Sequence, residues 1–261
     1  MTVYFIGAGP GAADLITVRG QRLLSRCPVC LYAGSIMPED LLALCPTDAR
    51  VIDTGALNLD QIIAALADAH TAGLDVARLH SGDPSIYSAL AEQCRRLDAL
   101  GIDYEIVPGV PAFAAAAAVL SRELTVPGVA QTVTLTRVAT LSSAMPQGED
   151  LQTLSAPGST LVLHLAAAQI HAIVPQLLDG GYRPETPCAV VAFASWPQQT
   201  VVRCPLADLT EETKAAGITR TAVIVVGDVL AAEGFSDSYL YSSGRVRHGG
   251  GREEHEGQRE H

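Results

Sequence analysis

The feature that most constrains this fold is a regular alternation of short apolar strands and helices over the first 120 residues. Each strand-like run is followed by a segment with apolar residues at helical spacing. Strands separated by single helices pair in parallel through right-handed crossovers. The sequence therefore predicts an α/β domain with a largely parallel sheet, whose strands include Val3–Ile6, Arg50–Asp53, Val76–Leu79 and Tyr104–Val107.

The second half of the chain has a different pattern. We expect strands at Gln131–Arg137, Ser159–His164, Pro187–Phe193, Thr200–Arg203 and Ala222–Val226. The short connection at Trp196–Gln198 predicts a hairpin, and hence a mixed sheet. We predict an N-terminal α/β domain over 1–120, a C-terminal α/β domain over 121–234 and a flexible tail over 235–261. The tail's histidines could bind a metal weakly, but its composition favours solvated disorder.

Charge and cysteine use exclude several classes of function. Lys plus Arg number 17 and Asp plus Glu 28, so the formal charge is −11. An acidic chain without a basic stripe argues against nucleic acid and anionic membranes as partners. We find neither a secretory signal nor a membrane-spanning apolar run, and six scattered cysteines indicate reduced thiols in the cytoplasm. The pair Cys27 and Cys30 has the spacing of a zinc or disulfide-exchange site, but without a second close pair we favour a packing role.

Four turns rich in small residues stand at strand ends: Gly7–Gly11, Ser81–Pro84, Pro108–Ala112 and Ala194–Trp196. The carboxyl ends of parallel strands are where open α/β sheets bind ligands, so we expect these turns to line one cleft between the domains. Such turns bind mainly through backbone groups, which suits a nucleoside sulfonium cofactor. We expect a helix over Ile86–Leu100 directly after the second turn.

Other chemistries have weaker support. The run from Gly7 to Ala12 fits the Gly-x-Gly-x-x-Ala form of a dinucleotide fingerprint. Pro10 interrupts that turn, however, Thr17 predicts a late helix start as its N-cap, and no acid follows in Cys30–Gly34, so an NAD-dependent oxidoreductase is disfavoured. The phosphate-binding loop and the common hydrolase motifs are absent from the sequence. We expect no metal site, and satisfied core roles for three histidines, at positions 80, 164 and 171.

Five motifs together resemble the tetrapyrrole (corrin/porphyrin) methyltransferase family and span the chain from residue 3 to about 230. They are Gly7-Ala-Gly-Pro-Gly11, Cys30-Leu-Tyr-Ala-Gly-Ser35, His80-Ser-Gly-Asp-Pro-Ser-Ile-Tyr87, Val107-Pro-Gly-Val110 and Thr219-Arg-Thr-Ala222. Tyr32–Ser35, Gly82–Ser88 and Leu163–Ala166 are similar to the branch that methylates carbon 11 of a corrin precursor in cobalamin synthesis. The uroporphyrinogen branch has an acid where this chain has Ala33, which counts against that reaction.

The resemblance implies a homodimer that binds S-adenosylmethionine between its domains, releases S-adenosylhomocysteine and acts on a small-molecule tetrapyrrole. It implies these cofactor-binding positions: Pro10, Ser81, Gly82, Asp83, Ile86, Pro111, Ala112, Leu165, Ala194, Thr221 and Ala222. A methylase of another corrin carbon, of cobalt-precorrin-4 or of a protein residue stays open, as does a non-catalytic S-adenosylmethionine-binding regulator.

A carbon nucleophile needs little help from a base, so we expect positioning and water exclusion to dominate catalysis. We assign Asp83 to shaping its turn and holding the cofactor, with proton transfer as the alternative. Because the substrate carries several carboxylates, we expect arginines in the cleft, with Arg122, Arg137 and Arg183 as candidates.

Overall fold

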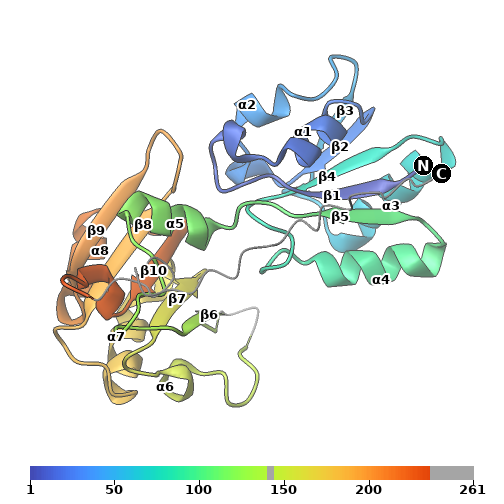
Figure 1. Cartoon of the computed structure of the whole chain (residues 1–261). Helices are drawn as coiled ribbons and strands as arrows, with labels where there is room; N and C mark the ends of the chain where they lie inside the picture. Colours follow the sequence, from blue (N-terminus) through green and yellow to red (C-terminus); the bar gives the residue numbers. More distant parts are fainter. Residues whose placement is uncertain (140–143, 236–261) are drawn as a thin grey trace, which may run out of the picture.

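The computed structural model describes residues 1–139 and 144–235. Its first half contains a sheet of five strands: β1 (Val3–Gly7), β2 (Val29–Tyr32), β3 (Arg50–Asp53), β4 (Val76–His80) and β5 (Tyr104–Val107). Their order is β3-β2-β4-β1-β5, and every neighbouring pair is parallel. The predicted parallel sheet is confirmed, and all five strands end at the same edge (Figure 1).

Alternation along each strand explains how both faces of this sheet are buried. In β1, Tyr4 and Ile6 pack with α1 (Val18–Leu24) and α2 (Glu39–Leu42) on one face. Val3 and Phe5 face the opposite side and pack with α3 (Leu59–Thr71) and α4 (Leu90–Leu100). Successive side chains of a strand point to opposite faces, so an unbroken apolar run in β1 supplies two hydrophobic cores.

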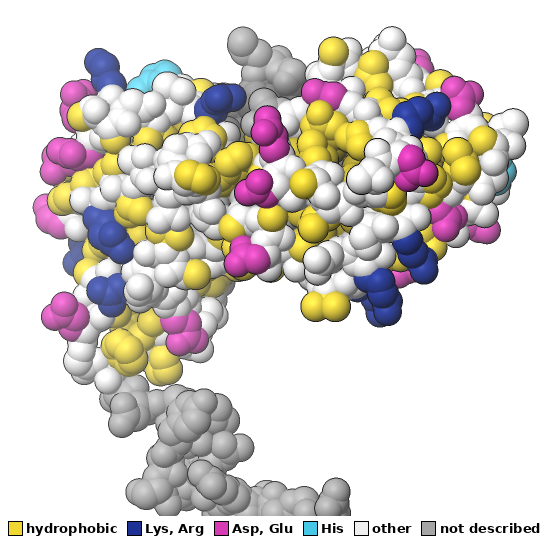
Figure 2. All heavy atoms as spheres, turned by 90° about the horizontal axis from the view of Figure 1, so that it is seen from above, with side chains coloured by type: hydrophobic (Ala, Val, Ile, Leu, Met, Phe, Trp, Pro, Cys, Tyr) yellow, Lys and Arg dark blue, Asp and Glu magenta, His cyan; other side chains and the backbone are white. Residues whose placement is uncertain are grey.

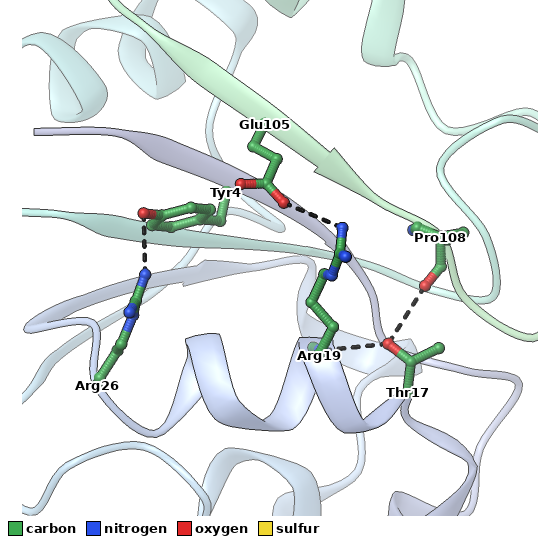
Figure 3. Close-up of polar contacts among 7 residues, drawn as sticks. Tyr4, Thr17, Arg19, Arg26, Glu105 and Pro108 are labelled. Carbon is green, nitrogen blue, oxygen red and sulfur yellow. Dashed lines mark hydrogen bonds and ion pairs between the residues drawn. The ribbon is translucent and has the colours of Figure 1, made fainter. Parts of the chain in front are cut away.

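Helix α1 is tied to the sheet by polar contacts at both ends (Figure 3). At its start Thr17 accepts a hydrogen bond from the Gly20 amide, which confirms the predicted N-cap. The same hydroxyl lies 3.5 Å from the Pro108 carbonyl in the loop after β5. At the other end Arg26 donates to the Tyr4 hydroxyl at 3.1 Å. The Thr17 contact holds the start of α1 beside the loop after β5, and the Arg26 contact holds its other end to β1.

The second half contains a mixed sheet, as predicted. Its strands are β6 (Val133–Arg137), β7 (Thr160–His164), β8 (Pro187–Ala192), β9 (Thr200–Pro205) and β10 (Ala222–Val226). Their order is β6-β7-β10-β8-β9, in which β6 and β7 are parallel and the other pairs antiparallel. The pairing of β8 with β9 confirms the predicted hairpin.

Helices cover both faces of the second sheet. On one face lie α7 (Ile170–Asp179) and α8 (Leu209–Ala215), with α6 (Leu151–Leu154) beside α7. On the other face α5 (Ala112–Leu120) packs its alanines against β8 and β10 (Figure 1). Helix α5 thus begins at the end of the first sheet and belongs to the core of the second. The division of the chain at residue 120 stays a prediction.

The predicted helix start at Ile86 is wrong. Tyr87 and Ala89 have φ angles of 52° and 54°, in the left-handed region, so no helix runs through them. Helix α4 begins only at Leu90, after a longer connection of residues 81–89. That connection leaves the carboxyl end of β4, where the cavity described below is found.

The packing role of Cys27 and Cys30 is confirmed, because both are buried free thiols, Cys27 between α1 and β2 and Cys30 within β2. Burial raises the pKa of Cys27 to about 12. The described residues include no cluster of three potential metal ligands, and none of their helices is long and apolar enough to cross a membrane. On the face shown in Figure 2, acidic and basic side chains are spread over both halves. Apart from Phe235, the predicted tail lies outside the described residues.

Candidate active site

Three loops that leave the first sheet meet above its carboxyl edge. The Gly9 amide donates to the Gly82 carbonyl at 3.2 Å, and the Gly82 amide returns a bond to Gly9 at 2.7 Å. Gly109, after β5, lies against both loops: a β-carbon there would be 2.2 Å from the Gly82 oxygen and 2.7 Å from the Gly7 α-carbon. Only glycine permits this approach of three backbones, so the small residues of these turns have a steric reason.

The fourth predicted turn reaches the same place from the second half of the chain. The Ala12 amide donates to the Ser195 hydroxyl at 2.9 Å, and the Trp196 indole N–H donates to the Pro10 carbonyl at 2.9 Å. The indole ring fills the space that a β-carbon on Gly11 would need. Four turns that are far apart in sequence are therefore joined into one wall.

Asp83 fastens its own turn to the next one. One carboxylate oxygen accepts from the Gly109 amide at 2.7 Å, and the other accepts from the Ser85 amide at 2.8 Å and from the Ser85 hydroxyl. Partial burial opposes ionisation, but these hydrogen bonds outweigh it and hold the pKa of Asp83 below its usual value. Asp83 is therefore an ionised acceptor in the neutral range, as expected of a turn-shaping residue.

A cavity of about 760 Å³ opens beside these turns and is lined from both halves of the chain. Of the predicted binding residues, the lining includes Pro10, Ser81, Ala112, Leu165, Ala194, Thr221 and Ala222. Gly82, Asp83, Ile86 and Pro111 are not among the described residues that line it. Gly82 and Asp83 instead join the turns, Pro111 is the N-cap of α5, and Ile86 precedes Tyr87 in the irregular connection.

Several lining residues were not predicted. They are Ile36, Tyr87, Ala89, His164, Ala166, Ala167, Ala168, Val191, Thr219, Arg220 and Val223. Thr219 and Arg220 belong to a motif already singled out, which was the signal that pointed to them. Ile36 and Val191 carry no such signal, because isolated apolar residues are typical of any core.

Of the three candidate arginines, the structure brings one to the cavity. Arg137 lines it and donates to the carbonyls of Val138 and Ala144. Arg122 instead donates to the Ala232 carbonyl, and Arg183 pairs with Asp228. Arg220 supplies a second guanidinium to the cavity and lies over the Phe193 ring at 5.9 Å.

Backbone strain is concentrated around this cavity. Among the described non-glycine residues with left-handed φ angles, Tyr87, Ala89, Leu165 and Thr221 all line it. Such conformations cost about 1–3 kcal/mol each and persist where the surrounding structure fixes them, commonly at ligand sites. The strain therefore marks this cavity as the candidate site independently of its lining.

The three histidines differ from the expectation of satisfied core residues. His171 is exposed on α7. His80 is buried beside Phe5, and His164 packs between Tyr87 and Phe113 at the cavity, but the Nε2 atom of each lacks a hydrogen-bond partner among the described residues. Burial lowers the pKa of His164, so its imidazole is neutral at neutral pH.

We predict that His80 makes the protein less stable in mild acid. Burial and then the charge of Arg78 lower the pKa of His80 to about 3, against a hydrogen bond to the Ser88 backbone. Its pKa in the unfolded chain is about 6.5, so the unfolded state binds the extra proton and stability falls as the pH drops below that value. The expected loss between pH 7 and pH 5 is on the order of 2 kcal/mol.

Urea denaturation at pH 7, 6 and 5 measures this loss. His80→Gln, which cannot gain a proton, is expected to lose less stability over the same range. His164 and Asp83 are present in both proteins. A difference between them in the dependence of unfolding free energy on pH is therefore due to His80. Equal slopes for the two proteins would show that His80 does not titrate in this way.

Comparisons with known proteins identify the class. Residues 2–210 match the family model described as Tetrapyrrole (Corrin/Porphyrin) Methylases. The chain belongs to this family. The precorrin-4 C(11)-methyltransferase of Mycobacterium tuberculosis is 78% identical over 249 residues, covering 95% of this chain and 98% of the relative. The precorrin-4 C(11)-methyltransferase of Rhodococcus erythropolis is 63% identical, covering 95% of this chain and 99% of the relative.

Solved structures agree with the fold. A cobalt precorrin-4 methyltransferase of cobalamin biosynthesis superposes with a TM-score of 0.85 at 38% identity, covering 88% of this chain and 95% of that one. A uroporphyrin-III C-methyl transferase from Thermus thermophilus, complexed with S-adenosyl homocysteine, superposes with a TM-score of 0.75 at 28% identity. The match covers 88% of this chain and 93% of that one. The two-sheet arrangement is thus that of known methyltransferases.

Proposed function

We propose that the chain transfers a methyl group from S-adenosylmethionine to C-11 of precorrin-4, giving precorrin-5 in cobalamin biosynthesis. The observation that carries this proposal is the 78% identity, over 95% of the chain, to a precorrin-4 C(11)-methyltransferase. The family match over residues 2–210 includes the lining residues Pro10, Ser81, Ala112 and Ala194. The enzyme is an S-adenosylmethionine-dependent C-methyltransferase.

The cavity residues fit this cofactor. Small apolar side chains from Pro10, Ala112, Ala194 and Ala222 leave room for a base and ribose, and Ser81 and Thr221 add hydroxyl groups to the lining. We propose that the lining members of the predicted set contact the cofactor directly. Gly82, Asp83 and Pro111 support them by fixing the turns, and Ile86 stays a prediction.

Two guanidinium groups and no carboxylate belong to the described lining of the cavity, through Arg137 and Arg220. Guanidinium groups recognise carboxylates through paired hydrogen bonds. The charge of the cavity therefore suits an acidic tetrapyrrole although the chain as a whole is acidic. We propose that Arg137 and Arg220 bind substrate carboxylates.

S-adenosylmethionine supplies an electrophilic methyl group on a sulfonium sulfur. The chain's residues bind and orient the two reactants and exclude water, which lowers the barrier without a protein nucleophile. The apolar lining performs the exclusion, and the joined turns fix the orientation. Asp83 acts on the turns and not on the reacting atoms, because it is not among the described residues that line the cavity and its carboxylate binds the amides of Gly109 and Ser85.

Incubation with methyl-labelled S-adenosylmethionine and either precorrin-4 or cobalt-precorrin-4 tests the proposal, with the labelled carbon located by NMR. We expect label at C-11 of precorrin-4. Label at another carbon, or only on the cobalt form, would replace the proposed substrate. Binding of S-adenosylhomocysteine without transfer to any corrin would favour a regulator, and a rise in melting temperature with NAD alone would favour an oxidoreductase.

We further propose a homodimer in the cytoplasm, with the chain divided at residue 120. Buried free thiols support a reducing compartment. Sedimentation of the purified protein measures the oligomeric state. Limited proteolysis at 121–130 tests the division of the chain.

A further inference from the structure

Arg78 in β4 is a buried cation that pairs with no carboxylate among the described residues. The residue is 5% exposed, and it takes part in no ion pair within residues 1–139 and 144–235. Its Nε donates to Gln93 Oε1 at 3.2 Å and its Nη1 donates to Thr54 Oγ1 at 3.1 Å. Burial lowers its pKa to about 10, so it remains charged at neutral pH. Burying a charge against neutral acceptors costs stability, which calls for a reason to keep it.

The bond from Arg78 fixes the orientation of the Gln93 amide. A guanidinium only donates hydrogen bonds, so the Gln93 oxygen must face it and the amide nitrogen must point away. That nitrogen donates to the Ala89 carbonyl at 2.8 Å. Gln93 is 2% exposed, so water does not compete for either group. Arg78 therefore acts on Ala89 through one buried side chain.

Ala89 and Tyr87 form a strained wall of the cavity. Both have left-handed φ angles, and both line the cavity. Neither residue type favours this conformation, so contacts from the surrounding structure must select it. The Gln93 bond to Ala89 is one such contact. Arg78, in β4, thus acts on this wall through the Gln93 side chain.

The second bond of Arg78 leads to another part of the lining. Thr54 Oγ1, which accepts from Arg78, donates to the Tyr32 carbonyl at the end of β2 at 2.8 Å. The turn Gly34–Ile36 follows directly, and Ile36 lines the cavity. The Arg78 guanidinium is thus bonded to Gln93, which contacts the lining after β4, and to Thr54, which contacts the end of β2 just before the lining residue Ile36.

We propose that Arg78 is a positioning residue which, through Gln93, holds the Tyr87–Ala89 wall in the conformation that binds the methyl donor. The proposal rests on the proposed function. It assigns a purpose to a buried charge that contacts neither the cavity nor an acid in the described part of the chain.

Gln93→Glu is the sharpest test, because glutamate keeps the volume and accepts from Arg78 but cannot donate to Ala89. Gln176→Glu is the matched control: Gln176 donates to the Ala172 carbonyl at 2.7 Å, the same bond four residues back along a helix, in α7 away from the cavity. Calorimetry gives the Kd for S-adenosylhomocysteine, and hydrogen exchange reports on the amides of residues 87–91. Gln93→Met removes the donor in a different way and serves if the glutamate variant does not fold.

We expect Gln93→Glu to raise the Kd about tenfold and to speed exchange at 87–91, with a melting temperature close to that of the wild type. Gln176→Glu should change neither the Kd nor the exchange at residues 87–91. An unchanged Kd in a folded Gln93 variant would overturn the proposal, whether or not exchange changes. If the wild type binds S-adenosylhomocysteine but does not methylate precorrin-4, the proposed function fails while the Kd comparison still tests the wall.

Discussion

Gly109→Ala is expected to destabilise the protein by about 3 kcal/mol and to abolish detectable binding of S-adenosylhomocysteine. A β-carbon at this position would lie 2.2 Å from the Gly82 carbonyl oxygen and 2.7 Å from the Gly7 α-carbon. Both obstacles are backbone atoms, so no side-chain rotation relieves them. The loops after β1, β4 and β5 must then separate, and the wall that they form is lost. The urea midpoint and calorimetric binding measure the two effects.

Gly55→Ala is the control for this prediction. The atom nearest to a β-carbon on Gly55 is a carboxylate oxygen of Asp53, at 3.1 Å, which is a side-chain atom and not backbone. Neither Gly109 nor Gly55 has a left-handed φ angle, so the two substitutions differ in the available space and not in backbone preference. A Gly109→Ala protein that unfolds at the wild-type urea concentration would show that the three backbones are not in contact.

Asp83→Ala is expected to weaken binding of S-adenosylhomocysteine at least about tenfold. The substitution removes the acceptor for the Gly109 amide and for both donors of Ser85. A hydrogen bond to a charged group contributes about 1.5–3 kcal/mol, and 1.4 kcal/mol is a factor of ten in affinity. Without the Asp83 carboxylate, the turn after β4 is no longer bonded to the turn after β5. Calorimetry and kcat measured against pH follow the effect.

Asp150→Ala provides a matched comparison for Asp83. Asp150 accepts from the Thr153 amide and the Thr153 hydroxyl, the same pair of bonds that Asp83 makes with Ser85, but it caps α6 outside the cavity lining. We expect its removal to leave the Kd unchanged. If Asp83→Ala keeps its affinity and only the pH profile of turnover shifts, Asp83 transfers protons and our assignment is wrong.

The central strand β1 of the first sheet could be predicted because burial on both faces requires an unbroken apolar run, here Val3–Ile6. The position of α5 could not be predicted in this way. Its alanines show only that the helix is buried, and periodicity does not tell which sheet covers it. The placement of such a helix depends on contacts between residues far apart in the sequence.

The parts of the candidate site that could be predicted are the turns rich in glycine and proline. The turns around Gly9, Gly82 and Gly109 were found because close backbone approach requires these residue types. The left-handed conformations of Tyr87 and Leu165 were not, because neither residue favours them and tertiary contacts select them. Arg78 was missed for the same reason: its partners Thr54 and Gln93 come from other parts of the chain.

The contact between Trp196 and the Pro10 carbonyl gives the protein a built-in optical reporter. The chain has a single tryptophan, and its ring rests on Gly11 where the two halves meet. Indole emission depends on the hydrogen bonding and polarity around the ring, so its wavelength and lifetime follow this one junction. The effect of ligand binding on this junction can therefore be measured by stopped-flow fluorescence without attaching a dye.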